Sequence, residues 1–234
     1  MNNYLFTPPA VYSLPVKGSD KRFPVKRIFC VGRNYHAHAI EMGRPVDKAT
    51  GKPFYFLKDC STLVDSGSTV PYPAGSANYH FEMELVVAIG AEGFRVQEAD
   101  AEKLIYGYAA GLDMTRRDLQ LVAREQGRPW DLGKNFEKSA VCTEIVPIGS
   151  LGVLKAGAIN LQVNGVQKQS ADINQLIWNI PEILADLSLY YHLQPGDLIY
   201  TGTPVGVGAV QSGDVITGHV DQVGDVRLTI GAAE

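Results

Sequence analysis

Two glutamates one residue apart, Glu82 and Glu84, stand in an apolar stretch over residues 79–90. Its Val and Ile content and its closing glycine predict a β-strand there. Because strand side chains alternate between two faces, both carboxylates would project from the same face. At ~4 Å two such charges repel by about 4 kcal/mol at an effective dielectric of about 20. Water on a solvated face, a shared proton or a divalent cation could relieve this repulsion.

A third carboxylate, Asp113, ends a buried strand predicted over residues 105–112. Residues 115–118 form a capping sequence for a helix expected to run to Gln126. At such a corner a carboxylate is either a helix cap or a ligand. If the three carboxylates converge, a hard divalent cation is the economical explanation. All-oxygen ligation favours Mg²⁺ or Mn²⁺ over Zn²⁺.

A histidine and a glutamate three residues apart, His38 and Glu41, share one face of a short helix predicted over residues 35–42. The histidine could act as a general base whose ring the glutamate orients. The alternative is a histidine on the solvated face of a surface helix. Lys134, in an irregular segment over residues 130–136, completes the candidate catalytic set.

The elements expected around these side chains are mainly strands joined by turns. Strands are predicted at residues 27–31 and 54–57, and two more close the chain at 214–220 and 224–230. Asn164-Gly165 predicts a hairpin turn.

Helices are expected to be fewer. The longest helical pattern covers residues 172–191, where Pro181 near its middle predicts a break. A shorter helix is predicted over residues 97–104. Residues 1–24, punctuated by four prolines, form a lead-in arm, and residues 25–234 form a single domain.

The composition is that of an ordinary soluble globular protein, with 45% hydrophobic and 20% charged residues among 234. A net charge of −4 without a basic run argues against nucleic acid as a partner. No apolar run approaches the ~18 residues of a membrane helix, and the N-terminus lacks a secretory signal pattern. Three widely spaced cysteines indicate reduced thiols. We therefore expect a cytoplasmic protein with no membrane partner.

Six blocks of residues, in this order, resemble the fumarylacetoacetate hydrolase family. They are residues 30–35 with His38 and Glu41, residues 56–58, 80–85, 107–120, 133–136 and 195–208. Together they span nearly the whole chain from about residue 25. A single block would be weak, whereas six in order are highly specific.

The resemblance implies the family's α+β fold, with layered and rolled mixed β-sheets and short helices, as one catalytic domain over residues 25–234. It implies a homodimer acting on 2,4-dioxo acids. The implied site residues fall into three groups. They are the Mg²⁺ or Mn²⁺ ligands Glu82, Glu84 and Asp113, the water-activating dyad His38 and Glu41, and the substrate-site residues Lys134, Arg117, Gln120 and Thr203.

Within the family, residues 23–35 and 198–204 most resemble the fumarylpyruvate hydrolases of bacterial gentisate degradation. The expected reaction is cleavage of fumarylpyruvate to fumarate and pyruvate by activated water, through a metal-stabilised pyruvate enolate. The alternatives are an acylpyruvate hydrolase, an oxaloacetate decarboxylase, an isomerase or hydratase of the same fold, and a non-catalytic metal-dependent dicarboxylate binder.

Some positions depart from the family pattern. Phe81 replaces a second histidine, Asp59 stands where proline is frequent, and His36 replaces a small residue. These departures bear on the substrate more than on the reaction type. Arg33, Lys58 and Arg128 are the substrate-binding candidates for a distal carboxylate, each with a solvated side chain as the alternative.

Overall fold

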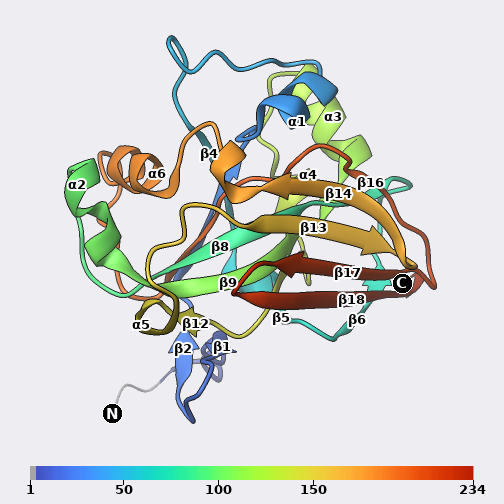
Figure 1. The fold of residues 1–234 in the computed structure, drawn as a ribbon. Coiled ribbons are helices and arrows are strands. Elements are labelled where there is room, and N and C mark those ends of the chain that lie inside the picture. Colours follow the sequence, from blue (N-terminus) through green and yellow to red (C-terminus); the bar gives the residue numbers. More distant parts are fainter. Residues whose placement is uncertain (1–3, 234) are drawn as a thin grey trace.

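The computed structural model describes residues 4–233, and two β-sheets form its body (Figure 1). The larger is an eight-stranded mixed sheet in the order β4-β3-β15-β8-β9-β11-β5, with β12 beside β9. Its strands are β3 (Arg27–Gly32), β4 (Phe54–Lys58), β5 (Leu63–Asp65), β8 (Met83–Ile89), β9 (Ile105–Asp113), β11 (Ala140–Cys142), β12 (Val146–Pro147) and β15 (Asp197–Tyr200). The predicted strands at 27–31, 54–57 and 105–112 are therefore confirmed.

The second sheet has five strands in the order β14-β13-β17-β18-β6. They are β6 (Thr69–Tyr72), β13 (Ala158–Val163), β14 (Val166–Asp172), β17 (Val215–Val220) and β18 (Gly224–Ala233). Asn164-Gly165 joins β13 to β14, as predicted, with both residues at positive φ. The two closing strands are also confirmed.

The core lies between the two sheets. Met83, Leu85 and Val87 alternate along β8 toward this core, together with Leu161 and Ile216 of the second sheet. The opposite face of β8 packs in a smaller cluster with Leu14 and Phe23 of the N-terminal hairpin, among others. Both faces of β8 are therefore covered, and every one of its residues is buried.

The sheets approach one another closely where β17 crosses β8. Gly218 of β17 lies against Met83, and a Cβ at Gly218 would collide with the Met83 sulfur. This contact fixes the start of β8, where Met83 lies between the two glutamates, relative to the second sheet.

The prediction of one continuous strand over residues 79–90 is wrong. The stretch is divided into β7 (Tyr79–Phe81) and β8, with Glu82 between them. β7 leaves the large sheet and pairs with β10 (Thr115–Arg116) and β16 (Gly208–Ala209) in a three-stranded sheet. The cause is distant in sequence: the Met83 N–H donates to Oε1 of the buried Gln169 at 3.0 Å.

Helices are short, as expected, and lie around the sheets. They are α1 (His36–Glu41), α2 (Glu98–Ala101), α3 (Arg117–Glu125), α4 (Asp131–Lys134), α5 (Ile148–Leu151) and α6 (Ile180–Leu187), with 3₁₀ turns at Cys60–Thr62, Glu102–Leu104 and Ile173–Gln175. α1 and α3 lie at the same end of the molecule (Figure 1). None of the helices in residues 4–233 is long and apolar enough to cross a membrane.

The helix predicted over residues 172–191 is wrong in extent. Only α6 is α-helical, and Pro181 lies in its first turn, where a missing backbone N–H costs little. Asn179 caps this helix: its side chain accepts from the Glu182 N–H at 3.0 Å, and Glu182 accepts from the Asn179 N–H at 2.8 Å. The helix predicted over residues 97–104 is one α-turn followed by a 3₁₀ turn.

The predicted cap at residues 115–118 is also wrong, because no side chain caps α3. Thr115 and Arg116 form a strand, and Asp118 instead accepts from Ser76 Oγ at 2.7 Å and the Ala77 N–H at 2.8 Å.

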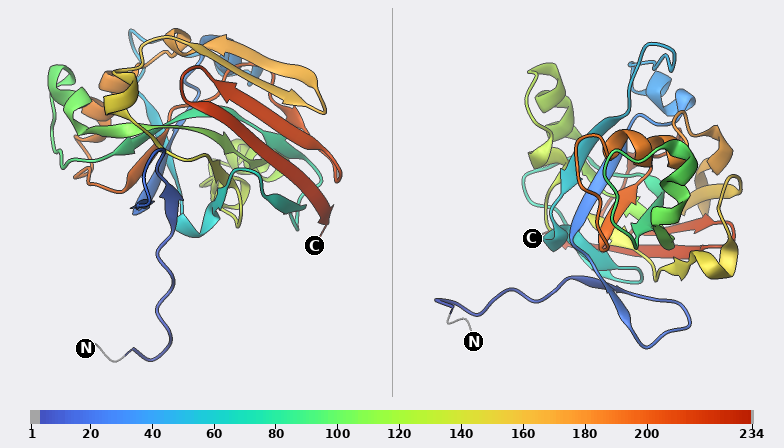
Figure 2. Two further views of the ribbon diagram at one scale, coloured as in Figure 1. Left: turned by 60° about the horizontal axis from the view of Figure 1, so that its bottom comes forward. Right: turned by 90° about the vertical axis from the view of Figure 1, so that its left-hand side faces the viewer.

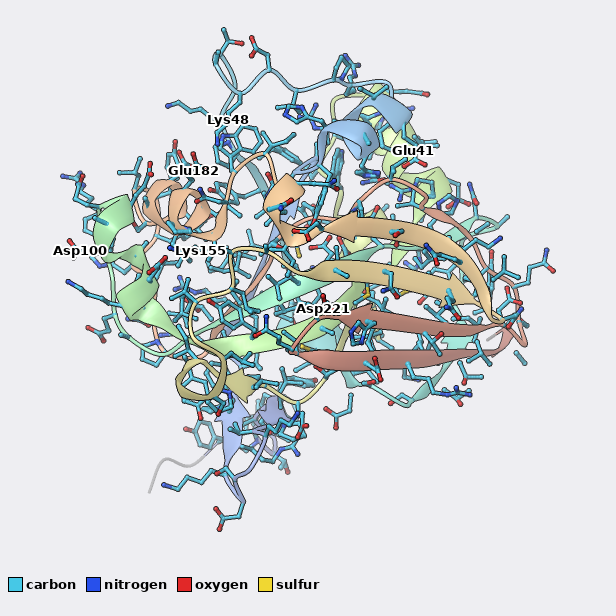
Figure 3. All side chains as sticks on the ribbon, viewed as in Figure 1. Glu41, Lys48, Asp100, Lys155, Glu182 and Asp221 are labelled. Carbon is cyan, nitrogen blue, oxygen red and sulfur yellow. The ribbon has the colours of Figure 1, made fainter. Side chains whose placement is uncertain are left out.

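Within residues 4–24, β1 (Ser13–Pro15) and β2 (Arg22–Pro24) pair as a hairpin that packs beneath the body. Residues 4–12 extend away from it (Figure 2). At the other end of the molecule, the polar loop after α1 is held by an ion pair between Lys48 Nζ and Glu182 Oε1 at 2.7 Å (Figure 3).

Candidate functional site

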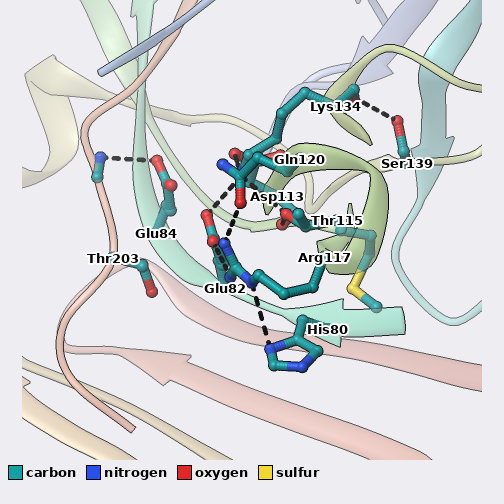
Figure 4. Close-up of polar contacts among 12 residues, drawn as sticks. His80, Glu82, Glu84, Asp113, Thr115, Arg117, Gln120, Lys134, Ser139 and Thr203 are labelled. Atoms are coloured by element: carbon teal, nitrogen blue, oxygen red, sulfur yellow. Dashed lines mark hydrogen bonds and ion pairs between the residues drawn. The ribbon is translucent and has the colours of Figure 1, made fainter. Parts of the chain in front are cut away.

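The three predicted carboxylates converge at the end of β8 and β9 (Figure 4). Glu82, Glu84 and Asp113 each offer an oxygen within 4.8 Å of the others, and all three are buried. The antiparallel pairing of β8 with β9 produces this convergence, because it sets Glu84 opposite Gly111 and Met83 opposite Leu112. The Asp113 N–H also donates to the Glu82 carbonyl at 2.9 Å.

Lys134 joins two of these carboxylates. Its Nζ donates to Glu82 Oε2 at 2.7 Å, Asp113 Oδ2 at 2.6 Å and Thr115 Oγ1 at 2.8 Å. Burial would lower the pKa of Lys134, but the charges of Asp113 and Glu82 raise it above its ordinary value. Lys134 is therefore a fixed ammonium between two carboxylates.

Arg117 holds the other oxygen of Glu82. Its guanidinium donates to Glu82 Oε1 and to Gln120 Oε1, and its Nε lies 3.4 Å from Nδ1 of His80. Burial would raise the pKa of Glu82, but the Lys134 and Arg117 charges outweigh it and hold that pKa below its usual range. Burial and the Arg117 charge lower the pKa of His80 to about 4, so its ring is neutral at neutral pH.

Glu84 differs from the other two carboxylates, because no cationic side chain of residues 4–233 pairs with it. Its Oε2 accepts from the Gly202 N–H at 2.7 Å. Burial, followed by the charges of Asp113 and Glu82, raises the pKa of Glu84 well above its usual range. A bound cation would oppose this shift, because it favours the charged carboxylate.

The donor set fits a hard divalent cation. All three ligands are oxygens, which suits Mg²⁺ or Mn²⁺. Asp113 Oδ1 is buried and accepts no hydrogen bond within residues 4–233. Lys58 Nζ lies 3.0 Å from this oxygen as an ion pair outside hydrogen-bond geometry. Glu84 thus retains one oxygen, Oε1, that accepts no hydrogen bond within residues 4–233, while both oxygens of Asp113 also face lysines.

Lys58 is neither a distal-carboxylate candidate nor a solvated lysine, and both predictions for it are wrong. It is 1% exposed. Its Nζ donates to the Met114 carbonyl at 3.1 Å, Ser139 Oγ at 2.8 Å and the Lys134 carbonyl. Lys58 therefore supports Asp113 and the backbone of Lys134 from behind.

His38 lies at the same pocket, and the surface-helix alternative for it is wrong, since it is only 5% exposed. Its Nδ1 is 2.9 Å from Glu41 Oε2. Glu41 lies behind His38 at the end of α1, and its Oε1 accepts from the Gly206 N–H at 3.1 Å. The carboxylate that orients the ring is therefore itself held by the loop after β15.

The entry to α1 is fixed by Asn34, which is fully buried. Its Nδ2 donates to the carbonyls of Trp178 and Thr201 at 2.9 and 2.8 Å, and its Oδ1 accepts from the Trp178 N–H at 2.8 Å. Gly202 is needed beside it, because its φ is +101° and a Cβ would lie 2.7 Å from Asn34 Cβ. This packing joins the histidine helix to the loop that touches Glu84.

Thr203, also predicted for the substrate site, is positioned by a residue that sequence reasoning missed. The buried Gln169 donates to Thr203 Oγ1 at 2.9 Å and to the Pro204 carbonyl at 2.7 Å, while it accepts from the Met83 N–H. One amide thus links the strand break at Glu82 to the Thr203 loop. No local pattern around Gln169 could reveal this role.

A single cavity of about 550 Å³ connects these groups. The predicted residues that line it are Arg33, His38, Glu82, Glu84, Asp113, Arg117, Gln120, Arg128, Lys134 and Thr203. Sequence reasoning missed two further arginines and four aromatic residues of the lining, namely Arg44, Arg124, Phe54, Tyr55, Phe56 and Trp130. The spacing of Phe54 and Phe56, two apart in a strand, was the available signal for a shared aromatic face.

Residues 27–231 match the profile of the fumarylacetoacetate (FAA) hydrolase C-terminal domain. The chain is 64% identical over 193 residues to a fumarylpyruvate hydrolase of a Ralstonia species, covering 82% of this chain and 100% of that protein. It is 40% identical over 205 residues to the mitochondrial oxaloacetate tautomerase of Rattus norvegicus, covering 88% of this chain and 91% of that protein.

Among solved structures, fumarylpyruvate hydrolase from Pseudomonas aeruginosa in complex with Mn²⁺ and pyruvate is similar to this chain. The TM-score is 0.94 at 47% identity, covering 98% of this chain and 100% of that chain. This similarity confirms the predicted fold, with mixed, rolled sheets and short helices.

Proposed function

The chain belongs to the fumarylacetoacetate hydrolase family, and we propose that it is a metal-dependent hydrolase that cleaves fumarylpyruvate to fumarate and pyruvate. One observation carries the proposal: a buried triad of carboxylates lines one cavity together with His38, whose ring is paired with Glu41. The identity to the Ralstonia enzyme supports the substrate. The family resemblance predicted from the sequence is confirmed.

Glu82, Glu84 and Asp113 would hold Mg²⁺ or Mn²⁺. The cation would supply Lewis-acid stabilisation of the negative charge that develops on the 2-oxo acid end of the substrate. Lys134 would fix Glu82 and Asp113 in their ligand positions. Arg117, itself held by Gln120 Oε1, would fix Oε1 of Glu82. Thr203 would contact the substrate from the opposite loop.

His38 would act as the general base. When the Nδ1–H of His38 donates a hydrogen bond to Glu41, Nε2 carries no proton and can accept one from water. The water oxygen bonds to C4 of the substrate, the C3–C4 bond breaks, and its electron pair remains on the pyruvate fragment. A proton added to C3 completes pyruvate, and the acyl fragment leaves as fumarate. Glu41, held by the Gly206 N–H, would keep the imidazole oriented and stabilise its protonated form.

A second candidate is oxaloacetate tautomerisation, because the Rattus norvegicus relative carries that name at 40% identity. A shift of a proton between carbon and the enol oxygen needs a base in the same cavity but no attacking water. A non-catalytic dicarboxylate binder would leave the His38–Glu41 pair without a role.

Four further proposals concern the domain extent, the cellular location, the metabolic role and the oligomeric state. Residues 25–234 would form one catalytic domain, preceded by the arm. The three unpaired cysteines are in keeping with a cytoplasmic location. A role in aromatic-compound catabolism would follow from the proposed substrate. A homodimer is supported by Leu5, Phe6 and Val11, apolar side chains that are exposed on the extended arm. Light scattering should give twice the 25.4 kDa chain mass; a monomer would refute the dimer.

Ultraviolet absorbance tests the proposed activity. Purified protein is mixed with fumarylpyruvate, acetylpyruvate or oxaloacetate, each with Mn²⁺, Mg²⁺ or EDTA. Fast, metal-dependent loss of fumarylpyruvate supports the proposal. Turnover of oxaloacetate alone supports the tautomerase, and bound metal without turnover of any compound supports a binder.

A further inference from the structure

One part of the cavity lining is strongly basic. Besides Arg117, four arginines line the cavity, namely Arg33, Arg44, Arg124 and Arg128. Within residues 4–233 the arginine ion pairs are formed by other residues, Arg22, Arg27 and Arg117. Apart from the carboxylates already described, Asp131 is the acidic residue in the lining. The cavity thus carries cationic side chains that the metal-ligand network does not use.

Arg33 is the best placed of the four. It follows β3 directly in a left-handed conformation, with φ +58°, and it is half-buried. Its Nε is buried and donates no hydrogen bond to any group of residues 4–233. Burial, then the nearby charges of Arg44 and Arg124, lower its pKa. Arg33 lines the cavity, forms no ion pair within residues 4–233 and lies near two like charges, so its guanidinium is suited to bind an anion.

An aromatic wall connects this arginine to the carboxylate end of the cavity. The Phe54 ring lies 5.5 Å from Arg33 Cζ, and the Phe56 ring lies 5.0 Å from Lys134 Nζ. Trp130 packs against both rings, with centroid distances of 4.9 and 5.8 Å. A flat, conjugated chain bound at the carboxylate end could lie along this wall and reach Arg33.

We propose that Arg33, with Arg44 and Arg124 beside it, binds the carboxylate at the end of the substrate remote from the 2-oxo acid. The chain then selects dioxo acids with a distal carboxylate over those that end in an alkyl group. This inference rests on the proposed function and adds the group that sets its specificity. Arg33 is a specificity residue in this account and takes no part in the proton transfer.

The test is the ratio of kcat/KM for fumarylpyruvate to that for acetylpyruvate, which ends in a methyl group. It is measured with Mn²⁺-loaded wild type and with Arg33→Gln. Hydrogen bonds between a guanidinium and a carboxylate stabilise the bound substrate more than neutral ones do. Their loss in Arg33→Gln should lower the ratio roughly 10- to 100-fold. Arg33→Lys, which keeps the charge, should recover part of the ratio.

Arg95 offers a matched control. It also has a positive φ, +53°, and its guanidinium lies 5.2 Å from the Phe94 ring, but it does not line the cavity. Arg95→Gln should leave the ratio unchanged. Should no variant turn over acetylpyruvate, the readout is KM for fumarylpyruvate, expected to rise at least about tenfold in Arg33→Gln and not in Arg95→Gln.

The possible failures are distinct. An equal fall in kcat/KM for both substrates in Arg33→Gln would overturn the inference and leave the proposed hydrolase standing. The same holds for an unchanged KM in Arg33→Gln if only fumarylpyruvate is turned over. Wild-type protein that cleaves neither substrate would overturn both.

Discussion

Lys58 Nζ lies 3.0 Å from Asp113 Oδ1, and both side chains are fully buried. The pair lies behind the carboxylate triad, where water cannot replace a lost partner. Loss of Lys58 would leave Asp113 Oδ1 without its buried cation, with Lys134 paired only to Oδ2. Removal of one member of a buried ion pair destabilises proteins by about 3–5 kcal/mol. Burial lowers the pKa of Lys58, yet Asp113 opposes this shift and favours the charged form.

Lys58→Met should therefore lower the free energy of unfolding by about 3 kcal/mol or more. Denaturant unfolding in EDTA measures this change without a contribution from metal. The control is Lys155→Met, at an exposed lysine on the surface (Figure 3), which should leave the midpoint nearly unchanged. Equal stability of the two variants would contradict the role given to Lys58.

The two histidines of α1 offer a catalytic variant and a matched control. His38 is buried beside Glu41, whereas His36 is exposed two residues earlier. His38→Ala should lower kcat for fumarylpyruvate by about 10²–10⁴-fold, the usual contribution of a general base, while Mn²⁺ binding is kept. His36→Ala should retain kcat. An unchanged kcat in His38→Ala would remove the proposed dyad.

Glu84 gives the most direct test of the metal site, because no cationic side chain of residues 4–233 competes for it. Loss of a group that hydrogen-bonds to a metal ligand typically lowers metal affinity about 10- to 100-fold. Loss of the proposed ligand itself in Glu84→Gln should therefore weaken Mn²⁺ binding by roughly 100-fold or more. Titration calorimetry measures this. Glu92→Gln, at an exposed carboxylate, is the control.

Metal binding should also stabilise the fold. At 100 times its Kd, Mn²⁺ should add about 2.7 kcal/mol to the free energy of unfolding of the wild type. The same Mn²⁺ concentration should add far less to Glu84→Gln. Equal stabilisation of both proteins would place the metal elsewhere.

The three thiols should differ sharply in reactivity. Burial raises the pKa of Cys142 to about 12 and that of Cys30 well above its usual range, while Cys60 is only partly buried. Since the thiolate is the nucleophile, Cys30 and Cys142 should stay unlabelled by iodoacetamide at pH 8. Cys60 should be labelled, faster as the pH rises toward its own raised pKa.

Mass spectrometry of the native and the denatured protein checks this order. All three cysteines should react once the chain is unfolded. Labelling of Cys142 before Cys60 in the native state would contradict the burial of the smaller core cluster.

Features with a local signal could be predicted from the sequence. The strand that ends at Asp113 carries its own apolar run, and the helix of His38 and Glu41 follows from their spacing and the glycine after it. The family resemblance supplied the expected metal ligands and substrate-site residues, and the structure brings these residues to one cavity.

Features set by distant partners could not be predicted. The strand breaks at Glu82 because Gln169, 86 residues away, captures the Met83 N–H. Lys58 looked like an ordinary lysine at a strand end, and only the fold shows that Asp113 and Ser139 surround it. The aromatic wall needs Trp130 to meet Phe54 and Phe56 across more than 70 residues.

Isotope labelling of the products tests the central claim most directly. Mn²⁺-loaded protein is incubated with fumarylpyruvate in H₂¹⁸O, and fumarate is analysed by mass spectrometry. Attack of water at C4 predicts that one ¹⁸O atom enters each fumarate formed, and that EDTA abolishes its formation. Recovery of intact fumarylpyruvate from protein with bound Mn²⁺, or of fumarate without the label, would contradict hydrolysis by activated water.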